Sequence, residues 1–407
     1  MDLRSGCPYW LVYNGLPHTY PALDQDLTCE VAVVGGGITG ALIGWHLIQA
    51  GISTVVLDKR EIGWGSTAAS TALLQYEIDT PLVKLADMLG PDHAVRAYQA
   101  CRQAIYKIEN LTQTLAEDCR FRRVPSLFLA KRKSDLGLMR REYEARLAAG
   151  FDLQWWDRKE LREHMGFDRP CAMISEDGGQ VDPYRMAHAL LHHGSQAGLQ
   201  VHDRTEVTRH EVKRGHVCLH TQRGCRVKAR HVVFATGYEV KEITRRKLMS
   251  LHSTYAFVTE PLPAGLEPLW HRNALVWEHA DPYLYLRTTH DRRVIIGGED
   301  EEFQDPEKRD ALLPSKVRTL QRKLKNLFPE LPFEVAFCWT GTFAETPDGL
   351  AYIGQMPGFE RAYFSLGFGG NGITYSVLAA EIIRDAVMGR VHPFQDLFRF
   401  DRKPHGV

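Results

Sequence analysis

The sequence contains no run of about 18 consecutive apolar residues, and its first ten residues lack the apolar core of a secretion signal. The 50 Lys and Arg residues balance the 50 Asp and Glu residues, so net charge gives no argument for binding nucleic acid or an acidic membrane surface. The eight cysteines are scattered, with no Cys-x-x-Cys pair and no neighbouring histidine at metal-ligand spacing. We therefore expect no disulfide framework, no metal site and no nucleic-acid partner. These absences favour a soluble, cytoplasmic protein without a transmembrane segment.

A strand, a glycine turn and a helix are predicted in succession near the N-terminus. Residues 31–34 form an apolar, largely β-branched run too short for a helix. The helix after the turn closes at Ala50-Gly51, where glycine suits a left-handed cap. A second apolar run, 54–57, ends in Asp58. This order predicts a βαβ unit.

The glycines of this unit have the spacing of a dinucleotide-binding turn. Gly35 permits the tight turn, Gly37 lets a pyrophosphate approach the backbone, and Gly40 lets the helix pack against the strand. The N–H groups at the helix start, around Ile38 and Thr39, suit phosphate oxygens. Asp58, about 20 residues downstream, is placed to accept the adenosine ribose hydroxyls. A glycine turn in an ordinary βαβ unit is the alternative, and the pattern does not choose between NAD and FAD.

The length of 407 residues predicts about two domains. The composition, 44% hydrophobic and 25% charged, is that of a globular protein. Residues 1–28 are expected to form an extended arm. Small, hydroxylated residues at 63–72 indicate backbone pressed against a flat or bulky group, or a helix start capped by Ser66 or Thr67. Helices are predicted at 91–117, 136–149, 158–165, 183–197, 315–327 and 373–388. Strands are predicted at 124–129, 199–202, 206–208, 217–220, 226–229, 231–237, 252–260, 274–277, 283–287, 293–297 and 363–366.

Four further motifs, taken with the glycine turn and Asp58, give the chain a family resemblance. They are Gly65-Ser66-Thr67, Ala235-Thr236-Gly237, Thr346-Pro347-Asp348-Gly349, and the turn from Gly367 to Thr374 that opens the last helix. Together they resemble the FAD-dependent oxidoreductases of the D-amino-acid oxidase, glycine oxidase and sarcosine oxidase family. The N-terminal half, from Tyr9-Trp10 to Gly65, is most similar to the branch of amine and γ-glutamylputrescine oxidases.

The resemblance implies a discontinuous α/β, Rossmann-like FAD-binding domain made of residues 1–88, 168–248 and 336–407. A second, α+β substrate domain of residues 89–167 and 249–335 would be built on an antiparallel sheet. The cofactor implied is FAD, bound non-covalently. Its expected contacts are Gly35, Gly37, Ile38, Thr39, Gly40, Asp58, Lys59, Gly65, Ser66, Thr67, Thr71, Ala72, Val207, Ala235, Thr236, Gly237, Gly341, Gly369, Gly370, Asn371, Gly372, Ile373 and Thr374.

The chain differs from the family at the positions that bind the substrate carboxylate, link the flavin covalently and activate oxygen. The arginines that hold the substrate carboxylate in glycine oxidases align with Phe343 and Gly370. The carboxylate-binding lysine of sarcosine oxidases aligns with Thr374, the flavin-linking cysteine with about Gly341, and the oxygen-activating lysine with about Ile295. A simple α-amino acid is therefore not expected to be held in the family manner.

The leading interpretation is an FAD-dependent enzyme that takes a hydride from the carbon next to an amine nitrogen, leaving an imine. The candidate pocket residues are Tyr76, Glu77, His252, Tyr255, Tyr285, Arg287 and Asn371. His252 is either a proton acceptor or an ordinary strand histidine, and Arg287 is either a substrate anchor or part of a surface ion pair. Glu77 and Asp79 meet a substrate cation or form local pairs, and the tyrosines are pocket or core residues.

Two other functions stay open. One is an FAD-dependent 2-hydroxy-acid dehydrogenase that passes electrons to a quinone or carrier, and the other is a flavin-binding protein without turnover. For the amine enzyme, the electron acceptor is oxygen or a carrier. The substrate is a small molecule in each enzymatic case.

Overall fold

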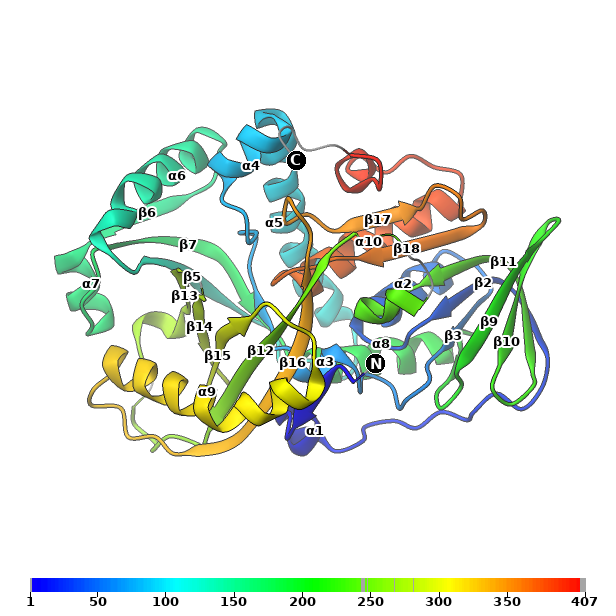
Figure 1. Ribbon diagram of the computed structural model, residues 1–407, viewed down its shortest axis with the longest axis horizontal. Coiled ribbons are helices and arrows are strands. Elements are labelled where there is room, and N and C mark those ends of the chain that lie inside the picture. Colours follow the sequence, from blue (N-terminus) through cyan, green and yellow to red (C-terminus); the bar gives the residue numbers. More distant parts are fainter. Residues whose placement is uncertain (1, 243–245, 247, 267, 281, 403–407) are drawn as a thin grey trace.

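The computed structural model of the protein describes residues 2–242, 246, 248–266, 268–280 and 282–402. Within these ranges the strands form two sheets, one on each side of the view in Figure 1. The chain crosses between the two sheets several times. Each sheet is therefore assembled from segments that are distant in the sequence.

The first sheet has eight strands among the described residues and is largely parallel at its centre. Its order is β17 (Tyr352–Gln355), β18 (Ala362–Leu366), β11 (Arg226–Phe234), β2 (Leu27–Val34), β3 (Thr54–Leu57) and β8 (Gln200–His202), with β10 (His216–Thr221) pairing β11 and β9 (Val207–Lys213) pairing β10. The pairings from β18 through β11, β2 and β3 to β8 are all parallel. The predicted βαβ unit is confirmed. The two runs expected at 226–229 and 231–237 are instead one strand, β11.

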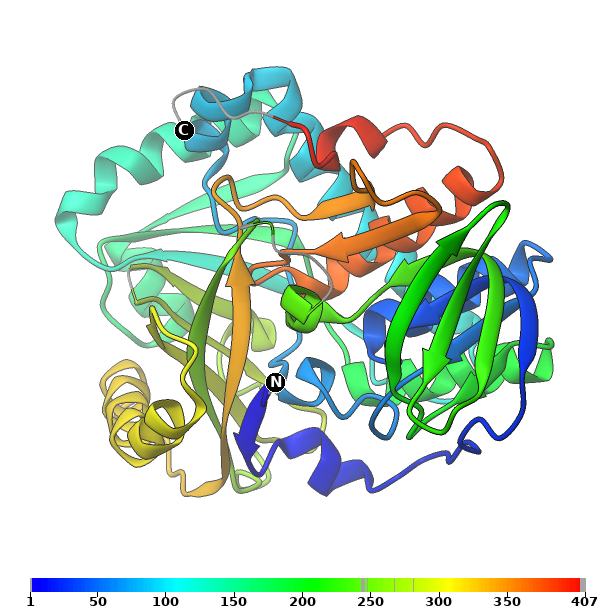
Figure 2. The ribbon, with the colours of Figure 1, turned by 45° about the vertical axis from the view of Figure 1, so that its right-hand side comes forward.

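Helices cover this sheet because their faces are rich in small and apolar side chains. α2 (Ile38–Gln49) packs against α8 (Pro183–Gln196) and α10 (Gly372–Val387), and α10 packs against α5 (Pro91–Thr114). α8 begins as predicted, with the Asp182 carboxylate accepting the N–H groups of Tyr184 and Arg185 at 3.1 and 2.9 Å. Figure 2 shows the β9–β10 hairpin extending from this part of the molecule.

The second sheet has ten strands within the described ranges and is mostly antiparallel. Its order is β1 (Arg4–Gly6), β16 (Val335–Glu345), β12 (Ser250–Thr259), β15 (Val294–Glu301), β14 (Leu284–Thr288), β13 (Leu275–His279), β5 (Arg122–Ala130), β7 (Cys171–Gln180) and β4 (Leu73–Leu74), with β6 (Leu153–Asp157) pairing β7. The other helices are α1 (Tyr9–Asn14), α3 (Ser66–Ala69), α4 (Leu82–Leu89), α6 (Leu136–Ala148), α7 (Arg158–Met165) and α9 (Pro306–Leu327).

α9 packs on β12, β15 and β16 and begins nine residues before the predicted start at Ser315. The Asp305 carboxylate caps it by accepting the Lys308 N–H at 3.0 Å, and Pro306 occupies the first turn. Pro314 lies inside the helix, so its presence did not mark the helix start.

Two strands of the ten-stranded sheet lie in segments that the expected domain division assigns elsewhere. β7 and β16 fall in segments 168–248 and 336–407, which were assigned to the FAD-binding domain, yet both strands pair within the ten-stranded sheet. The N-terminal arm is not wholly extended either. Its β1 pairs with β16, Arg4 opposite Gly341, and α1 follows. The domain division stays a prediction.

Candidate active site

A cavity of about 600 Å³ is lined by residues of both sheets. Every expected cofactor residue lies along its wall except Gly40 and Thr374. A Cβ at Gly40 would collide with the carbonyl oxygen of Gly35, so this glycine serves the close packing of α2 on the turn. Thr374 is buried in α10 and donates to the carbonyl of Asn371 at 2.9 Å. Direct binding of FAD by the wall residues stays a prediction.

One end of the cavity is the N-terminus of α2. Gly37 is the N-cap and brings no capping side chain, while the N–H of Ile38 donates to the Thr67 hydroxyl at 2.9 Å. The φ of Gly35 is +112°, and a Cβ there would collide with the carbonyl oxygen of Ala235. The helix therefore presents backbone N–H groups and its positive dipole end to the cavity, as a pyrophosphate requires.

Asp58 lies on the wall directly after β3, as the sequence predicts. Its carboxylate accepts the N–H of Gly36 at 2.6 Å and that of Arg60 at 2.8 Å. Burial raises the pKa of Asp58 to about 6, and the two backbone donors oppose that shift. Lys59 and Arg60 both pair with Glu239, at 3.0 and 2.9 Å. Arg60 and Glu239 also line the cavity and were not predicted.

Two hydroxyl groups test whether this cavity suits FAD. Ser66 Oγ and Thr236 Oγ1 are buried and have no hydrogen-bond partner among the described residues, and both residues line the cavity. Buried polar groups are nearly always paired, so these two indicate a polar ligand along this wall. The glycine turn, Asp58 and these hydroxyls fit the phosphates and ribose of a dinucleotide.

The backbone carbonyl groups of segment 69–72 accept hydrogen bonds from side chains of the surrounding protein. Trp339 and Trp10 donate their indole N–H groups to Ala69 and Ser70, at 2.8 and 2.7 Å. Arg287 Nη1 lies 2.7 Å from the Ala72 oxygen and 3.0 Å from that of Val181. Thr71 and Ala72 line the cavity while their carbonyls are tied into the protein.

The structure therefore corrects the expected role of Arg287. Its guanidinium is buried and directed to backbone carbonyls, and the residue does not line the cavity. Burial lowers its pKa to about 10, so it is still a cation at neutral pH. Its charge supports the backbone of segment 69–72, and the side chain is not placed to anchor a substrate.

The turn before α10 meets the segment that follows β4. The Asp79 carboxylate accepts the N–H of Gly370 at 2.8 Å, and a Cβ at Gly369, whose φ is +52°, would collide with that carboxylate. The Asp79 side chain is exposed to the cavity, and desolvation by the surrounding protein raises its pKa to about 7, helped by the charge of Glu345. Asn371 donates its amide to the backbone of the same segment, at the carbonyls of Gln75 and Glu77.

The other candidate pocket residues divide between wall and core. Glu77 and Tyr285 line the cavity, whereas Tyr76, Tyr255 and His252 do not. Tyr76 is buried and stacks on Phe151 with ring centroids 4.9 Å apart. Tyr255 packs in the core beneath α9.

His252 lies on β12 opposite Phe343. Its Nε2 is 3.7 Å from the Glu345 carboxylate, so it is a strand histidine beside an acid and not a group facing the cavity.

Four further wall residues were not singled out from the sequence: Phe128, Arg146, Trp277 and Tyr283. Phe128 and Trp277 stack with centroids 3.8 Å apart, and Tyr283 packs against Tyr285 at 5.4 Å. Arg146 lies on α6, four residues after Glu142, a spacing typical of a surface pair. Only the fold shows that this pair is buried at the cavity wall.

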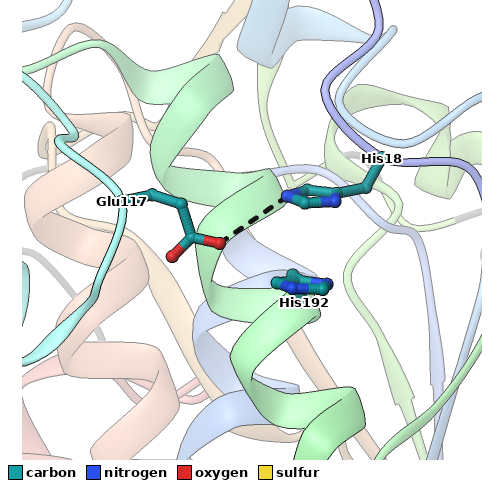
Figure 3. A group of neighbouring side chains, drawn as sticks. All are labelled: His18, Glu117 and His192. Atoms are coloured by element: carbon teal, nitrogen blue, oxygen red, sulfur yellow. Dashed lines mark ion pairs between the residues drawn. The ribbon is translucent and has the colours of Figure 1, made fainter.

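A second polar cluster, at His18, Glu117 and His192, is shown in Figure 3. Potential ligand atoms of the three residues all lie within 4.8 Å of one another. The rings of His18 and His192 stack at 4.0 Å with an interplanar angle of 6°. Lone pairs in the planes of parallel rings do not converge on one point, so we assign no metal to this cluster. It joins the N-terminal arm to α8 and to the loop after α5.

The geometry agrees with comparisons with known proteins. Residues 30–386 match the family model described as FAD dependent oxidoreductase. The γ-glutamylputrescine oxidoreductase of Escherichia coli (strain K12) is 26% identical over 400 residues, covering 95% of this chain and 89% of that protein. The glycine oxidase of Geobacillus kaustophilus (strain HTA426) is 26% identical over 398 residues, covering 92% of this chain and 97% of that protein.

The fold is also found in a solved structure. The crystal structure of glycine oxidase from Geobacillus kaustophilus superimposes with a TM-score of 0.77 at 23% identity, covering 92% of this chain and 99% of that one. Across the described part of the chain, helices of sufficient length and apolarity to cross a membrane are absent. The cofactor is FAD, bound non-covalently as is general in this family. Because the family model spans most of its length, this chain belongs to the FAD-dependent oxidoreductase family of the D-amino-acid oxidase type and is an enzyme.

Proposed function

We propose that this enzyme oxidises the carbon next to the nitrogen of a cationic amine that is larger than a simple amino acid. The observation that carries the proposal is the charge of the substrate end of the cavity. Asp79 stands beside the turn before α10, while Phe343 and Gly370 occupy positions where the family resemblance implies arginine. Among the described residues, Asp79 forms no ion pair with Lys, Arg or His.

The walls around Asp79 also suit a cation. Tyr283 and Tyr285 line the cavity, and so do Trp277 and Phe128. The faces of aromatic rings attract ammonium groups, by about 0.5 to 2 kcal/mol for each favourable contact. A carboxylate substrate would instead meet Asp79 with like charge, which disfavours the 2-hydroxy-acid alternative.

The chemistry needs placement more than an acid or base. FAD, when bound, takes up the hydrogen and electron pair of the cleaved C–H bond. The amine must be neutral at that moment, so that its nitrogen lone pair can form the C=N bond and leave an iminium ion that water hydrolyses to a carbonyl compound and an amine. The chain supplies orientation, through the turn before α10 and the aromatic wall.

The relatives support the amine class by their names. One is a γ-glutamylputrescine oxidoreductase and another is a glycine oxidase. Both names describe oxidation of a compound that carries an amino group. The electron acceptor is oxygen or a carrier. A separate experiment, which measures how fast each of them reoxidises the reduced flavin, decides between the two.

Anaerobic bleaching of the flavin tests the proposal. Putrescine, cadaverine and N-alkylated amines should reduce the flavin faster than glycine, sarcosine or D-alanine, and faster than lactate or glycolate. A misplaced C–H bond costs about 100-fold in rate, which sets the scale expected for the small amino acids. Fastest reduction by glycine or D-alanine would contradict the proposal, and fastest reduction by a hydroxy acid would favour the alternative.

A further inference from the structure

Two cysteines stand opposite each other where β1 pairs with β16. The register of these antiparallel strands places Gly6 opposite Trp339. One residue further along, the N–H of Cys7 donates to the carbonyl oxygen of Cys338 at 3.0 Å. Opposed residues of such a hydrogen-bonded pair have Cα atoms about 5.5 Å apart. A disulfide spans Cα separations of about 4.4 to 6.8 Å, so the backbone is already at bridging distance.

Gly6 permits the close approach of the two segments. Its φ is +79°, and a Cβ at this position would lie 2.6 Å from the carbonyl oxygen of Cys338 and 3.0 Å from the Cα of Trp339. A side chain at residue 6 would therefore push Cys7 away from Cys338. The N-terminal arm is held against β16 directly before its cysteine.

The two side chains belong to the same face of the sheet. Cys338 packs against the apolar core beneath α9, and the hydroxyl of Thr340 contacts an acid of that helix. Trp339, between them, points the other way and donates to the carbonyl of Ala69. Directly opposed residues of antiparallel strands share a face, so Cys7 lies on the face of Cys338. The charge of Cys7 accordingly adds to the burial that raises the pKa of the Cys338 thiol.

The two thiols differ in their access to solvent. Both are free; Cys7 is exposed and Cys338 is half-buried. Of the other six cysteines, four are buried and two, Cys29 and Cys225, are half-buried. A dissolved oxidant therefore reaches Cys7 first, and the thiol beside it is Cys338. An exposed thiol next to a second cysteine is the arrangement typical of a redox-sensitive pair.

We propose that Cys7 and Cys338 form a reversible disulfide when the protein meets a peroxide. Hydrogen peroxide transfers one oxygen atom to the Cys7 sulfur, which gives a sulfenic acid and one water molecule. The Cys338 sulfur then attacks the Cys7 sulfur and the S–S bond forms. The hydroxyl group leaves with the proton of Cys338 as a second water molecule. The two thiols lose two electrons in total, and these reduce the peroxide.

The disulfide ties the N-terminal arm to a strand of the cavity wall. Leu3 lines the cavity, and its carbonyl accepts the N–H of Thr342 at 2.9 Å. Gly341 and Thr342, both on β16, also line the cavity. The modification is separate from the proposed amine oxidation, so flavin reduction by any substrate neither supports it nor contradicts it.

Peptide mass spectrometry of the holoenzyme tests the pair. After brief treatment with hydrogen peroxide, each chain should lose two hydrogen atoms and yield one linked pair of peptides that contain Cys7 and Cys338. Dithiothreitol should restore both thiols. A sulfinic acid at Cys7 with Cys338 still free, or a disulfide between the Cys7 residues of two chains, would overturn the proposal.

Serine variants assign the reaction to these two residues. Cys7→Ser and Cys338→Ser should each abolish the loss of two hydrogen atoms. Cys225→Ser is the matched control, because Cys225 is also half-buried but contacts the carbonyl of Leu23. It should form the disulfide at the parental rate. A disulfide within the chain of either of the first two variants, or none in the control, would contradict the assignment.

Hydrogen exchange measures what the disulfide does to the arm. The amides of residues 4–7 should exchange about tenfold more slowly in the oxidised parent protein than in the reduced one, because local opening of β1 is restricted. Peroxide-treated Cys7→Ser should exchange at the rate of the untreated variant. Equal exchange in the oxidised and reduced parent would overturn the claim that the disulfide fixes the arm.

Discussion

The side-chain amide of Asn371 donates a hydrogen bond to the carbonyl oxygen of Glu77 at 2.8 Å. This contact joins the turn before α10 to the segment that carries both acids of the substrate end. Asp79 makes the second link by accepting the N–H of Gly370 at 2.8 Å. The same two contacts thus position the turn before α10 and the segment 75–79, two parts of the cavity wall, relative to each other.

Acid precipitation of the purified yellow protein should leave all of its FAD in the supernatant. The reason is that Gly341 lines the cavity, and the family resemblance aligns the flavin-linking cysteine of sarcosine oxidases with about this position. The measurement is the flavin absorbance of supernatant and pellet. Flavin retained in the washed pellet would mean a covalent bond to another residue.

The substitution Gly37→Val should yield protein without cofactor. A Cβ at this N-cap would lie 2.9 Å from Thr67 Oγ1, and the branched side chain beyond it would fill the space that the pyrophosphate needs. The ratio of flavin to protein absorbance reports the loss. Gly137→Val, at an exposed helix position with open space around it, is the control and should keep full occupancy.

Replacing Asp58 by alanine should weaken FAD binding by about 1.5 to 3 kcal/mol, the range for hydrogen bonds to a charged group. The carboxylate also accepts two backbone N–H groups, so the turn itself is expected to loosen. Fluorescence titration of the FAD-depleted protein gives the dissociation constant. A constant equal to that of the parent would show that the ribose is bound elsewhere.

Arg287→Lys should lower the free energy of unfolding by about 2 to 4 kcal/mol, because a lysine cannot reach all the carbonyls that the guanidinium binds. FAD affinity should fall with it, while the ranking of substrates stays the same. Denaturant unfolding and the substrate panel are the measurements, with exposed Arg322→Lys as control. A changed ranking of substrates would indicate that Arg287 contacts the substrate.

Binding of tetramethylammonium, whose charge is independent of pH, should tighten about tenfold from pH 6 to pH 8 as Asp79 ionises. This follows from its raised pKa of about 7. The same shift makes the folded protein bind more protons than the unfolded chain above the ordinary value of 3.8, so Asp79 lowers stability as pH rises toward 7. Asp79→Asn should flatten both profiles, and exposed Asp87→Asn should flatten neither. A pH-independent affinity in the parent protein would contradict the assignment.

Local patterns predicted the nucleotide-binding unit well. The strand, the glycine turn, α2 and Asp58 lie within about 30 residues, and each part has a short-range signal in the sequence. The strands β7 and β16 were not predicted, because the pairing that makes a segment a strand depends on partners far along the chain. β7 pairs with β4, β5 and β6, and β16 pairs with β1 and β12.

The substrate end shows the same limit at the level of single side chains. Arg287 was placed on the correct strand, but the sequence did not show which way its guanidinium points. Arg146 follows Glu142 by one helical turn, which is the commonest surface pattern, and its burial comes from packing between α6 and the rings around it. Long-range packing, which no local window contains, decides both roles.

The cavity is completed by residues 368–373, near the far end of the chain, although its first wall residue is Leu3. During synthesis β11, which pairs with β2, therefore lacks its other parallel partner until β18 leaves the ribosome. Such long-range pairing is slow, and its exposed strand edges invite aggregation. A cofactor that binds in this cavity meets a complete wall only after residues 368–373 have been synthesised, so its capture is a late event in biogenesis.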